Sequence, residues 1–386
     1  MEKVLNRISS LLLLLTIAGS YLMWIVGIDT KVTAFIYTNS LYFLIIVIGL
    51  VLLLNVNRLE KSDWAMIGLA LFFGVFYTLT SSMRHSNRFI NATIPIIILL
   101  VLCFKICQFD RIDKGILFSI SIVSLFATLY RLSVELPKLD MIDKNNNKLA
   151  YIWINTNTIG AALLFSILMV VILIQATPIG YYKIIVVPIY IAGLASMWII
   201  ESKTSFLVLI LFIVINTSIP KKILQKNKWW VLLFLLIFLI MPSIFYYCAN
   251  SSDLNLFTER ERIWNEFFGK WLSSNQNIWI GMTPFVASWK PLGTHNSFLN
   301  ILGNFGILGY ILITGYFSYY FVRFVFSKKL YTKFQVGLLL AFLVIFVHSF
   351  MEDTLTAYHW MPILYSFIGI SLQCPDDNSS KALKKK

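Results

Sequence analysis

Charged residues, and acidic residues above all, are scarce in this sequence. Only 13% of the 386 residues are charged, and 18 Asp and Glu stand against 32 Lys and Arg, which leaves a net charge of +14. Soluble globular chains carry about 25% charged residues. The low charge content and the mean hydropathy of +0.78 therefore exclude a soluble globular protein. The basic residues lie mainly in short loops between apolar runs, so we expect no nucleic-acid partner.

Cysteine, histidine and cofactor motifs are scarce as well. The four cysteines show no zinc or redox spacing. Cys103 and Cys107 are four residues apart, which favours packing inside one helix over metal binding. No P-loop, Rossmann or haem motif occurs, and no Asp-x-Asp pair stands in an expected outer loop. We therefore expect neither a cofactor nor a metal.

Long apolar runs are what the sequence has instead. Runs of about 17–25 residues, the length of helix that crosses about 30 Å of hydrocarbon, recur along the whole chain. The first, Ser9 to Ile28, resembles a signal peptide but is long and lacks a small-x-small cleavage site, so we interpret it as a span. The sequence predicts an all-α polytopic membrane protein with about twelve spans, at 9–28, 40–55, 63–81, 91–106, 115–131, 158–176, 182–200, 204–220, 229–248, 298–326, 334–350 and 359–373.

The loops predict one domain and an orientation. No low-complexity linker divides residues 1–386, and the two halves show no internal repeat, which weakens a transporter interpretation. With both termini in the cytoplasm, 20 of the 32 Lys and Arg fall inside and 12 outside, as the positive-inside rule requires. Two outer segments are then long: 132–157, and 250–297 between the ninth and tenth spans.

Several of the twelve outer basic residues stand at the outer ends of spans, against the insertion bias. They are Arg84, Arg88, Lys203, Arg260 and Arg262. A guanidinium group suits bidentate contact with phosphate oxygens, so a converging set would bind a lipid pyrophosphate. Solvated charges, or side chains reaching to lipid phosphates, are the alternative. The very short loop around Lys203 favours binding there.

His295 stands in the stretch THNSFLNILGNFGILGY, where a polar loop gives way to an apolar run. Position alone favours an interfacial polar residue, with Thr294 or Asn296 as the N-cap of the following helix. Imidazole is also the side chain best suited to removing a proton from a sugar hydroxyl near neutral pH. Both interpretations remain open on position alone.

Small and amide residues mark the beginnings of two spans. Gly303, Gly306 and Gly309 recur at every third position and predict close helix–helix packing. Asn155 and Asn157, in INTNTIG, open another span and predict a helix cap and a glycan contact.

Five further polar residues lie near the outer ends of spans. Glu352 and Asp353 follow His348 at the end of the eleventh span. They could bind sugar hydroxyls or a cation, but we expect them to be solvated. His85 and His359 are expected to be interface residues.

Four short motifs together carry a resemblance to a known family. His295-Asn296, nine residues, then Gly306-Ile307-Leu308-Gly309 resembles the H-[NSQ]-x9-G-x-x-[GTY] signature of the bacterial O-antigen ligase and O-antigen/capsule polymerase superfamily. Arg260-x-x-x-Trp264 with Ile280-Gly281 looks like the start of its large outer loop. Ser202 to Ser205 is similar to its S-[RK]-[TG]-[SA] segment, and Asn155 to Gly160 to its N-x-N-x-x-G helix start. The motifs run in family order over the second half of the chain; the first half matches only in hydropathy.

The resemblance implies a GT-C-like, metal-independent glycosyltransferase on the outer face of the bacterial cytoplasmic membrane, with residues 250–297 as its large outer catalytic loop. The donor would be a glycan on undecaprenyl pyrophosphate. His295 would deprotonate the acceptor hydroxyl, and Arg260 would bind the pyrophosphate leaving group. Lys203 stands where many members carry Arg, and no motif aligns Arg84 or Arg88. The remaining candidates for substrate binding are Arg262, Asn155, Asn157 and Asn296.

The acceptor stays open between two enzymes. A polymerase would extend lipid-linked repeat units of an O-antigen, capsular or exopolysaccharide, whereas a ligase would move the glycan to lipid A–core in lipopolysaccharide biosynthesis. Ligases often carry a further histidine two residues before the motif histidine, and Gly293 stands there, which favours the polymerase. A polysaccharide flippase is the third alternative. Membrane lipids and a chain-length regulator are further expected partners.

Overall fold

The computed structural model describes residues 1–28, 30–136, 149, 152–177, 182–251, 260–289, 292–328 and 331–373. Every regular element in these ranges is helical and none is a strand, which confirms the all-α prediction. The outer segments 132–157 and 250–297 fall partly outside the described residues, and Cys374 and the tail Lys381–Lys386 wholly outside them.

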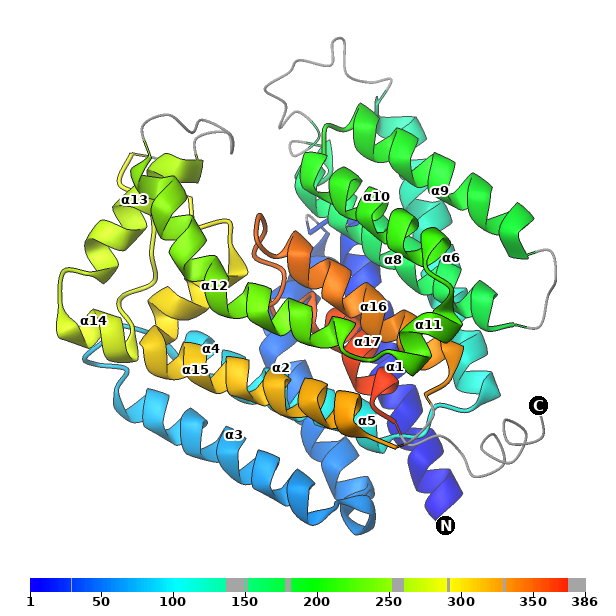
Figure 1. The fold of residues 1–386 in the computed structure, drawn as a ribbon, viewed down its shortest axis with the longest axis horizontal. Helices are drawn as coiled ribbons and strands as arrows, with labels where there is room; N and C mark the ends of the chain where they lie inside the picture. The colour runs from blue at the N-terminus through cyan, green and yellow to red at the C-terminus, as the bar shows by residue number, and fades with distance from the viewer. Residues whose placement is uncertain are drawn as a thin grey trace.

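The helices follow one another along the chain (Figure 1). The first half holds α1 (Glu2–Val26), α2 (Lys31–Leu54), the short 3-10 helix η1 (Val56–Arg58), α3 (Lys61–Leu79), α4 (Arg88–Asn91), α5 (Thr93–Ile106), α6 (Arg111–Glu135) and α8 (Thr156–Ala176). The second half holds α9 (Tyr182–Ile199), α10 (Lys203–Ser218), α11 (Lys221–Lys226), α12 (Trp230–Asn250), α13 (Arg260–Trp271), α14 (Asn275–Ile280), α15 (Ser297–Phe326), α16 (Lys333–His348) and α17 (Met361–Ser371).

Seven of the described helices are long and apolar enough to cross a membrane: α1, α2, α3, α6, α8, α12 and α15. Five more are apolar but shorter: α5, α9, α10, α16 and α17. The 16 residues of α16, at a rise of about 1.5 Å each, reach only about 24 Å. A protein with several helices able to span a membrane is thus confirmed, whereas the number of twelve spans stays a prediction.

The helices divide into a buried core and an apolar periphery. Inside the molecule, 89% of the apolar window of α8 is buried, against 17% for α3. The large apolar side chains Leu71, Phe72 and Leu79 of α3 are therefore exposed. Exposed apolar surface on this scale is expected where a molecule faces lipid instead of water.

The molecule has two ends that differ in composition. At one end, which we call the site end, α13 and α14 lie beside the start of α15; the N-terminus lies at the opposite end, the pocket end (Figure 1). The loops of the pocket end are joined by hydrogen bonds, such as Asn6 Nδ2 to Gln108 O at 2.9 Å and Gln335 Nε2 to Gln373 O at 2.7 Å. They include the basic loops that are predicted from the sequence to be cytoplasmic.

The helix α15 is kinked at Gly306, whose φ of +64° lies outside the helical region. The kink coincides with three successive carbonyl groups that accept hydrogen bonds from other segments. Gly303 O accepts from Met282 N at 2.7 Å, Asn304 O from Arg84 Nη1 at 2.6 Å and Phe305 O from Tyr77 Oη at 2.8 Å. Within an apolar environment a freed carbonyl must be satisfied by the protein itself.

The glycine stripe of α15 permits close contacts, as its spacing predicts, although the partners are unexpected. A Cβ on Gly306 would lie 2.4 Å from the backbone of Trp279, and one on Gly303 would lie 2.7 Å from the ring of Phe267. These partners belong to the α13–α14 segment, whereas a Cβ on Gly309 would lie 2.8 Å from Tyr77 Oη of the apolar helix α3, as helix–helix packing predicts. The kink itself was not predicted.

Candidate functional site

The Asn155–Gly160 and Ser202–Ser205 motifs lie against each other at the site end. A Cβ on Gly160 would lie 2.0 Å from Ser202 Oγ and 2.9 Å from Ser205 Oγ, so only glycine allows α8 to approach the start of α10 this closely. Ser205 Oγ in turn shares a hydrogen bond of 3.1 Å with Nε2 of His348, the last residue of α16. The two motifs thus pack against the helix that leads into Glu352.

The Arg260-x-x-x-Trp264 motif places two side chains one turn apart on α13, where residues i and i+4 share a face. The buried Trp264 donates from Nε1 to Thr294 O at 3.0 Å and so fixes the residue before His295. Arg260 donates from Nη2 to Glu352 Oε1 at 2.8 Å and from Nη1 to Met351 O. Through Trp264 and Arg260, the motif therefore connects α13 both to the residue before His295 and to Glu352.

His295 occupies a constrained backbone position. Its φ is +47°, in the left-handed region that residues other than glycine seldom adopt. Next to it, Asn296 Oδ1 accepts from the backbone N–H groups of Phe298 and Leu299, and its Nδ2 donates to Phe350 O at 2.8 Å. Such a conformation persists where the surroundings over-determine it, and it is common at functional sites. Asn296 is thus the N-cap of α15, one of the two caps that the sequence allows.

The candidate site consists of Arg260, His295 and Glu352. The carboxylate of Glu352 lies between the other two, with Oε1 on Arg260 and Oε2 3.9 Å from His295 Nδ1. The side chains of Arg260 and Glu352 are 17% and 14% exposed, whereas that of His295 is 36% exposed. The imidazole is thus the group that a ligand can reach, and the carboxylate supports it from behind.

Burial and neighbouring charge act in opposite directions on Glu352. Burial raises the pKa of its carboxyl, but contact with His295 and the positive charge of Arg260 lower it, and the pKa lies below its ordinary value. Glu352 is therefore an anion at neutral pH, able to orient an imidazole and to stabilise its protonated form.

The expectation that Glu352 and Asp353 are solvated is wrong. Asp353 accepts hydrogen bonds from Ser297, Asn300 and Thr356, and burial raises the pKa of its carboxyl. Both acids face inward because the chain between α16 and α17 folds back over the start of α15. Nothing in the local sequence distinguishes a buried pair of acidic residues, such as Glu352 and Asp353, from a solvated one. The only signal is that acidic residues are few in this chain.

Two of the expected ligand-binding residues have structural roles instead. Arg84 is fully buried, and besides Asn304 O its guanidinium bonds Tyr77 O, Asn91 Oδ1 and Thr80 Oγ1. Burial lowers its pKa to about 10, so it remains charged at neutral pH. Asn296 is also fully buried as the cap of α15. Neither side chain faces a space for substrate.

The other expected residues differ in how they are placed. Lys203 is exposed at the first turn of α10, and Arg262 is exposed on α13 with its guanidinium 4.4 Å from the Trp289 ring. Asn155 caps α8 by accepting from Asn157 N at 2.8 Å, which confirms the predicted cap. The side chain of Arg88, at the start of α4, lies outside the described residues.

No protein-family model, curated protein or solved structure matches this chain. In the described part of the chain, no group of three or more His, Cys, Asp or Glu side chains could hold a metal ion. The chemistry of the candidate site is thus the basis for assigning a function. Its elements are an accessible imidazole, a carboxylate behind it and a guanidinium on the carboxylate's other oxygen.

Proposed function

We propose that this protein is a membrane glycosyltransferase of the outer face of the bacterial cytoplasmic membrane. It transfers a glycan from undecaprenyl pyrophosphate to a sugar hydroxyl and polymerises polysaccharide repeat units. The observation that carries the proposal is the cluster of Arg260, His295 and Glu352, which two of the sequence motifs bring together at one end of a helical membrane protein. The other two motifs pack on each other and on His348, at the end of the helix that leads into Glu352. In the proposed orientation both termini are cytoplasmic.

In this mechanism His295 is the general base. The acceptor oxygen attacks the anomeric carbon of the donor, the bond from that carbon to the pyrophosphate oxygen breaks, and the hydroxyl proton moves to the imidazole. Glu352, 3.9 Å from Nδ1, directs that nitrogen inward and leaves Nε2 for the acceptor. A positioned base contributes about 10²–10⁴-fold to the rate.

Positive charge stabilises the leaving group. The pyrophosphate gains charge as its bond to the sugar breaks, and fixed cations near it lower the barrier. Arg260 retains N–H groups beyond those bonded to Glu352 and Met351. The exposed cations of Lys203 and Arg262 stand on α10 and α13 of the same end.

The test compares His295→Ala with His85→Ala in cells and with purified protein. His85 is a matched control because it is exposed, has a φ of +48° and follows α3 at the site end. We expect His295→Ala to lower glycan assembly about 10²-fold or more, with normal insertion, and His85→Ala to change it little. Equal activity of the two variants would refute the base assignment.

The acceptor is tested with lipid-linked repeat units supplied alone to purified protein. A polymerase converts them into a ladder of longer chains. A product that forms only after lipid A–core is added would show a ligase instead.

A further inference from the structure

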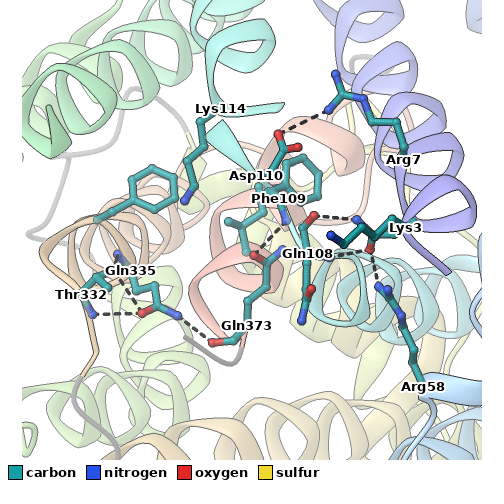
Figure 2. Close-up of a pocket in the computed structure, with 13 residues that line it drawn as sticks. Lys3, Arg7, Arg58, Gln108, Phe109, Asp110, Lys114, Thr332, Gln335 and Gln373 are labelled. Atoms are coloured by element: carbon teal, nitrogen blue, oxygen red, sulfur yellow. Dashed lines mark hydrogen bonds and ion pairs between the residues drawn. The ribbon is translucent and has the colours of Figure 1, made fainter. Parts of the chain in front are cut away.

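A polar cavity of about 430 Å³ opens at the pocket end, far from the candidate site. It lies between the start of α1, the α5–α6 loop, the start of α16 and the end of α17 (Figure 2). The helix α16 separates it from the candidate site, since Phe334 and Gln335 line the cavity and His348 ends the same helix. Ligand-binding cavities typically enclose about 300–1,000 Å³. We call this cavity the basic pocket.

The amide side chains of the basic pocket are already used to join helix ends. Asn6 Oδ1 accepts from Gln108 N at 2.9 Å and from Arg58. Gln335 accepts from Thr332 N, as part of the cap of α16, and donates to Gln373 O. Gln373 donates to Phe104 O at 2.8 Å. The amides thus form a fixed frame, and the dashed lines in Figure 2 mark those of its bonds that join two pocket-lining residues.

Several Lys and Arg side chains of the basic pocket have no carboxylate partner in the described residues and could bind an anionic ligand. Four Lys and Arg and a single carboxylate, that of Asp110, line the basic pocket. Arg7 pairs with Asp113 and Asp110, but in the described residues no carboxylate lies within 4.0 Å of Lys3, Arg58 or Lys114. The carboxylate of Asp110 is directed to the N-terminus of α6, where it accepts from Asp113 N at 2.8 Å. The basic pocket therefore carries an excess of positive charge.

Helix ends and apolar surface complete the environment. The N-termini of α1, α6 and α16 all border the basic pocket, and each contributes partial positive charge from its free N–H groups. Near Lys3 and Arg58 in the sequence, the apolar side chains of Val4, Ile8 and Leu53 are exposed on α1 and α2. A ligand that fits both features has an anionic head and an apolar body.

We propose that the basic pocket binds the phosphate headgroup of an anionic phospholipid, with Lys3, Arg58 and Lys114 as the residues that contact it. Basic pockets at the ends of membrane helices suit such headgroups, and each nearby Lys or Arg strengthens the interaction. The acyl chains lie along the exposed apolar surface of α1 and α2. The binding is independent of glycosyl transfer at the other end.

The experiment counts lipids bound to the purified full-length protein by native mass spectrometry. Phosphatidylglycerol, phosphatidylcholine and inorganic phosphate are titrated separately. The pocket variant carries Lys3→Gln, Arg58→Gln and Lys114→Gln. The control carries Lys61→Gln, Lys222→Gln and Lys226→Gln, which removes the same charge from exposed residues of the pocket end that do not line the basic pocket.

We expect phosphatidylglycerol to bind the parent and the control alike and the pocket variant about tenfold or more weakly. Equal binding by the pocket and control variants would overturn the proposal, as would equal binding of phosphatidylcholine to the parent. Inorganic phosphate that binds as tightly as the lipid would assign the basic pocket to a free anion and overturn the lipid assignment. If the triple variant does not fold, Lys3→Gln with Lys114→Gln keeps the Arg58–Asn6 bond and decides the same question.

Discussion

The carboxylate of Glu352 lies between the guanidinium of Arg260 and the imidazole of His295, one oxygen toward each. The arrangement supports the proposed role of His295 as a base over that of an interfacial polar residue, and the test of that role is the His295→Ala variant. Asn296 performs the capping, because its side chain accepts from the first N–H groups of α15. The imidazole is left partly exposed, with an acid behind it. This is what a base needs, whereas an interfacial polar residue needs no such partner.

The variant Glu352→Gln tests whether Glu352 positions His295 or binds the lipid-linked donor. Gln has the size of Glu but cannot stabilise a protonated imidazole. If Glu352 acts through His295, kcat falls about 10²-fold while KM for the lipid-linked donor stays nearly constant. The measurement is steady-state chain extension with purified protein, and Glu352→Asp is expected to recover part of the rate. A fall in activity that appears only in KM would contradict the positioning role.

The same carboxylate predicts a pH dependence of stability. Its pKa lies below its ordinary 4.5 in the folded protein, so the ionised form stabilises the fold. That contribution is fully present above about pH 4.5 and is lost as the pH falls through the lower folded-state pKa.

The check is thermal unfolding of wild-type protein and Glu352→Gln between pH 7 and pH 3. We expect the variant to be less stable at pH 7 by about 1–3 kcal/mol, and the difference to shrink at the acid end. Subtracting the two curves removes the contribution of Asp353, whose raised pKa acts in the opposite direction. A constant difference at all pH values would contradict the assignment.

Among the elements, α15 decides the geometry of the site end. Its first turns pack on α14 and, at Gly303, on Phe267 of α13, and the bend at Gly306 lets the rest of the helix continue toward the pocket end. The three carbonyl groups at the bend accept from Met282, Arg84 and Tyr77, which come from separate segments. The buried Arg84 therefore supports the shape of α15, a role that explains a cation in an apolar setting without a ligand.

Gly306→Ala tests the bend. A Cβ there would meet the backbone of Trp279 at 2.4 Å, in a φ region that alanine avoids. We expect a loss of stability of at least about 1–3 kcal/mol. Gly315→Ala is the matched control, since it lies in the same helix with nothing within 4 Å of its Cβ, and it should leave stability unchanged or raise it slightly. Unfolding of both variants in detergent is the measurement, and equal effects would count against a bend that requires glycine.

At the scale of the whole molecule, the two ends carry different chemistry. The site end gathers Arg260, His295 and Glu352, and the pocket end gathers the basic loops around Lys3 and Lys114. The positive-inside rule predicts that the pocket end faces the cytoplasm. In that orientation the proposed glycosyl transfer and the proposed phospholipid binding lie on opposite faces of the membrane.

Labelling with a membrane-impermeant maleimide tests this orientation. Ser273 and Lys222 are exposed at the site end and the pocket end, respectively, and the described cysteines Cys103, Cys107 and Cys248 are buried. We expect Ser273→Cys to react in intact cells and Lys222→Cys to react only after permeabilisation, with the parent chain as the background control. Reaction of Lys222→Cys in intact cells would reverse the orientation.

The sequence by itself determined the helical class of this protein and the approximate place of its apolar helices. The physical reason is that a stretch such as 158–176 carries enough apolar residues to indicate its helix without knowledge of its neighbours. The cap at Asn155 was predictable because capping acts within one helical turn. The glycine spacing of α15 predicted close packing but not the α13–α14 segment that Gly303 and Gly306 meet.

Only the tertiary structure decided which polar residues meet. Glu352 follows a span 57 positions after His295 and 92 after Arg260, and its burial depends on the chain folding back over α15. Arg84 and Arg260 look alike in sequence, as single arginines near helix ends, yet one is enclosed at a helix bend and the other holds a carboxylate. Burial and pairing are set by contacts between distant segments, and a local pattern of residues carries no record of them.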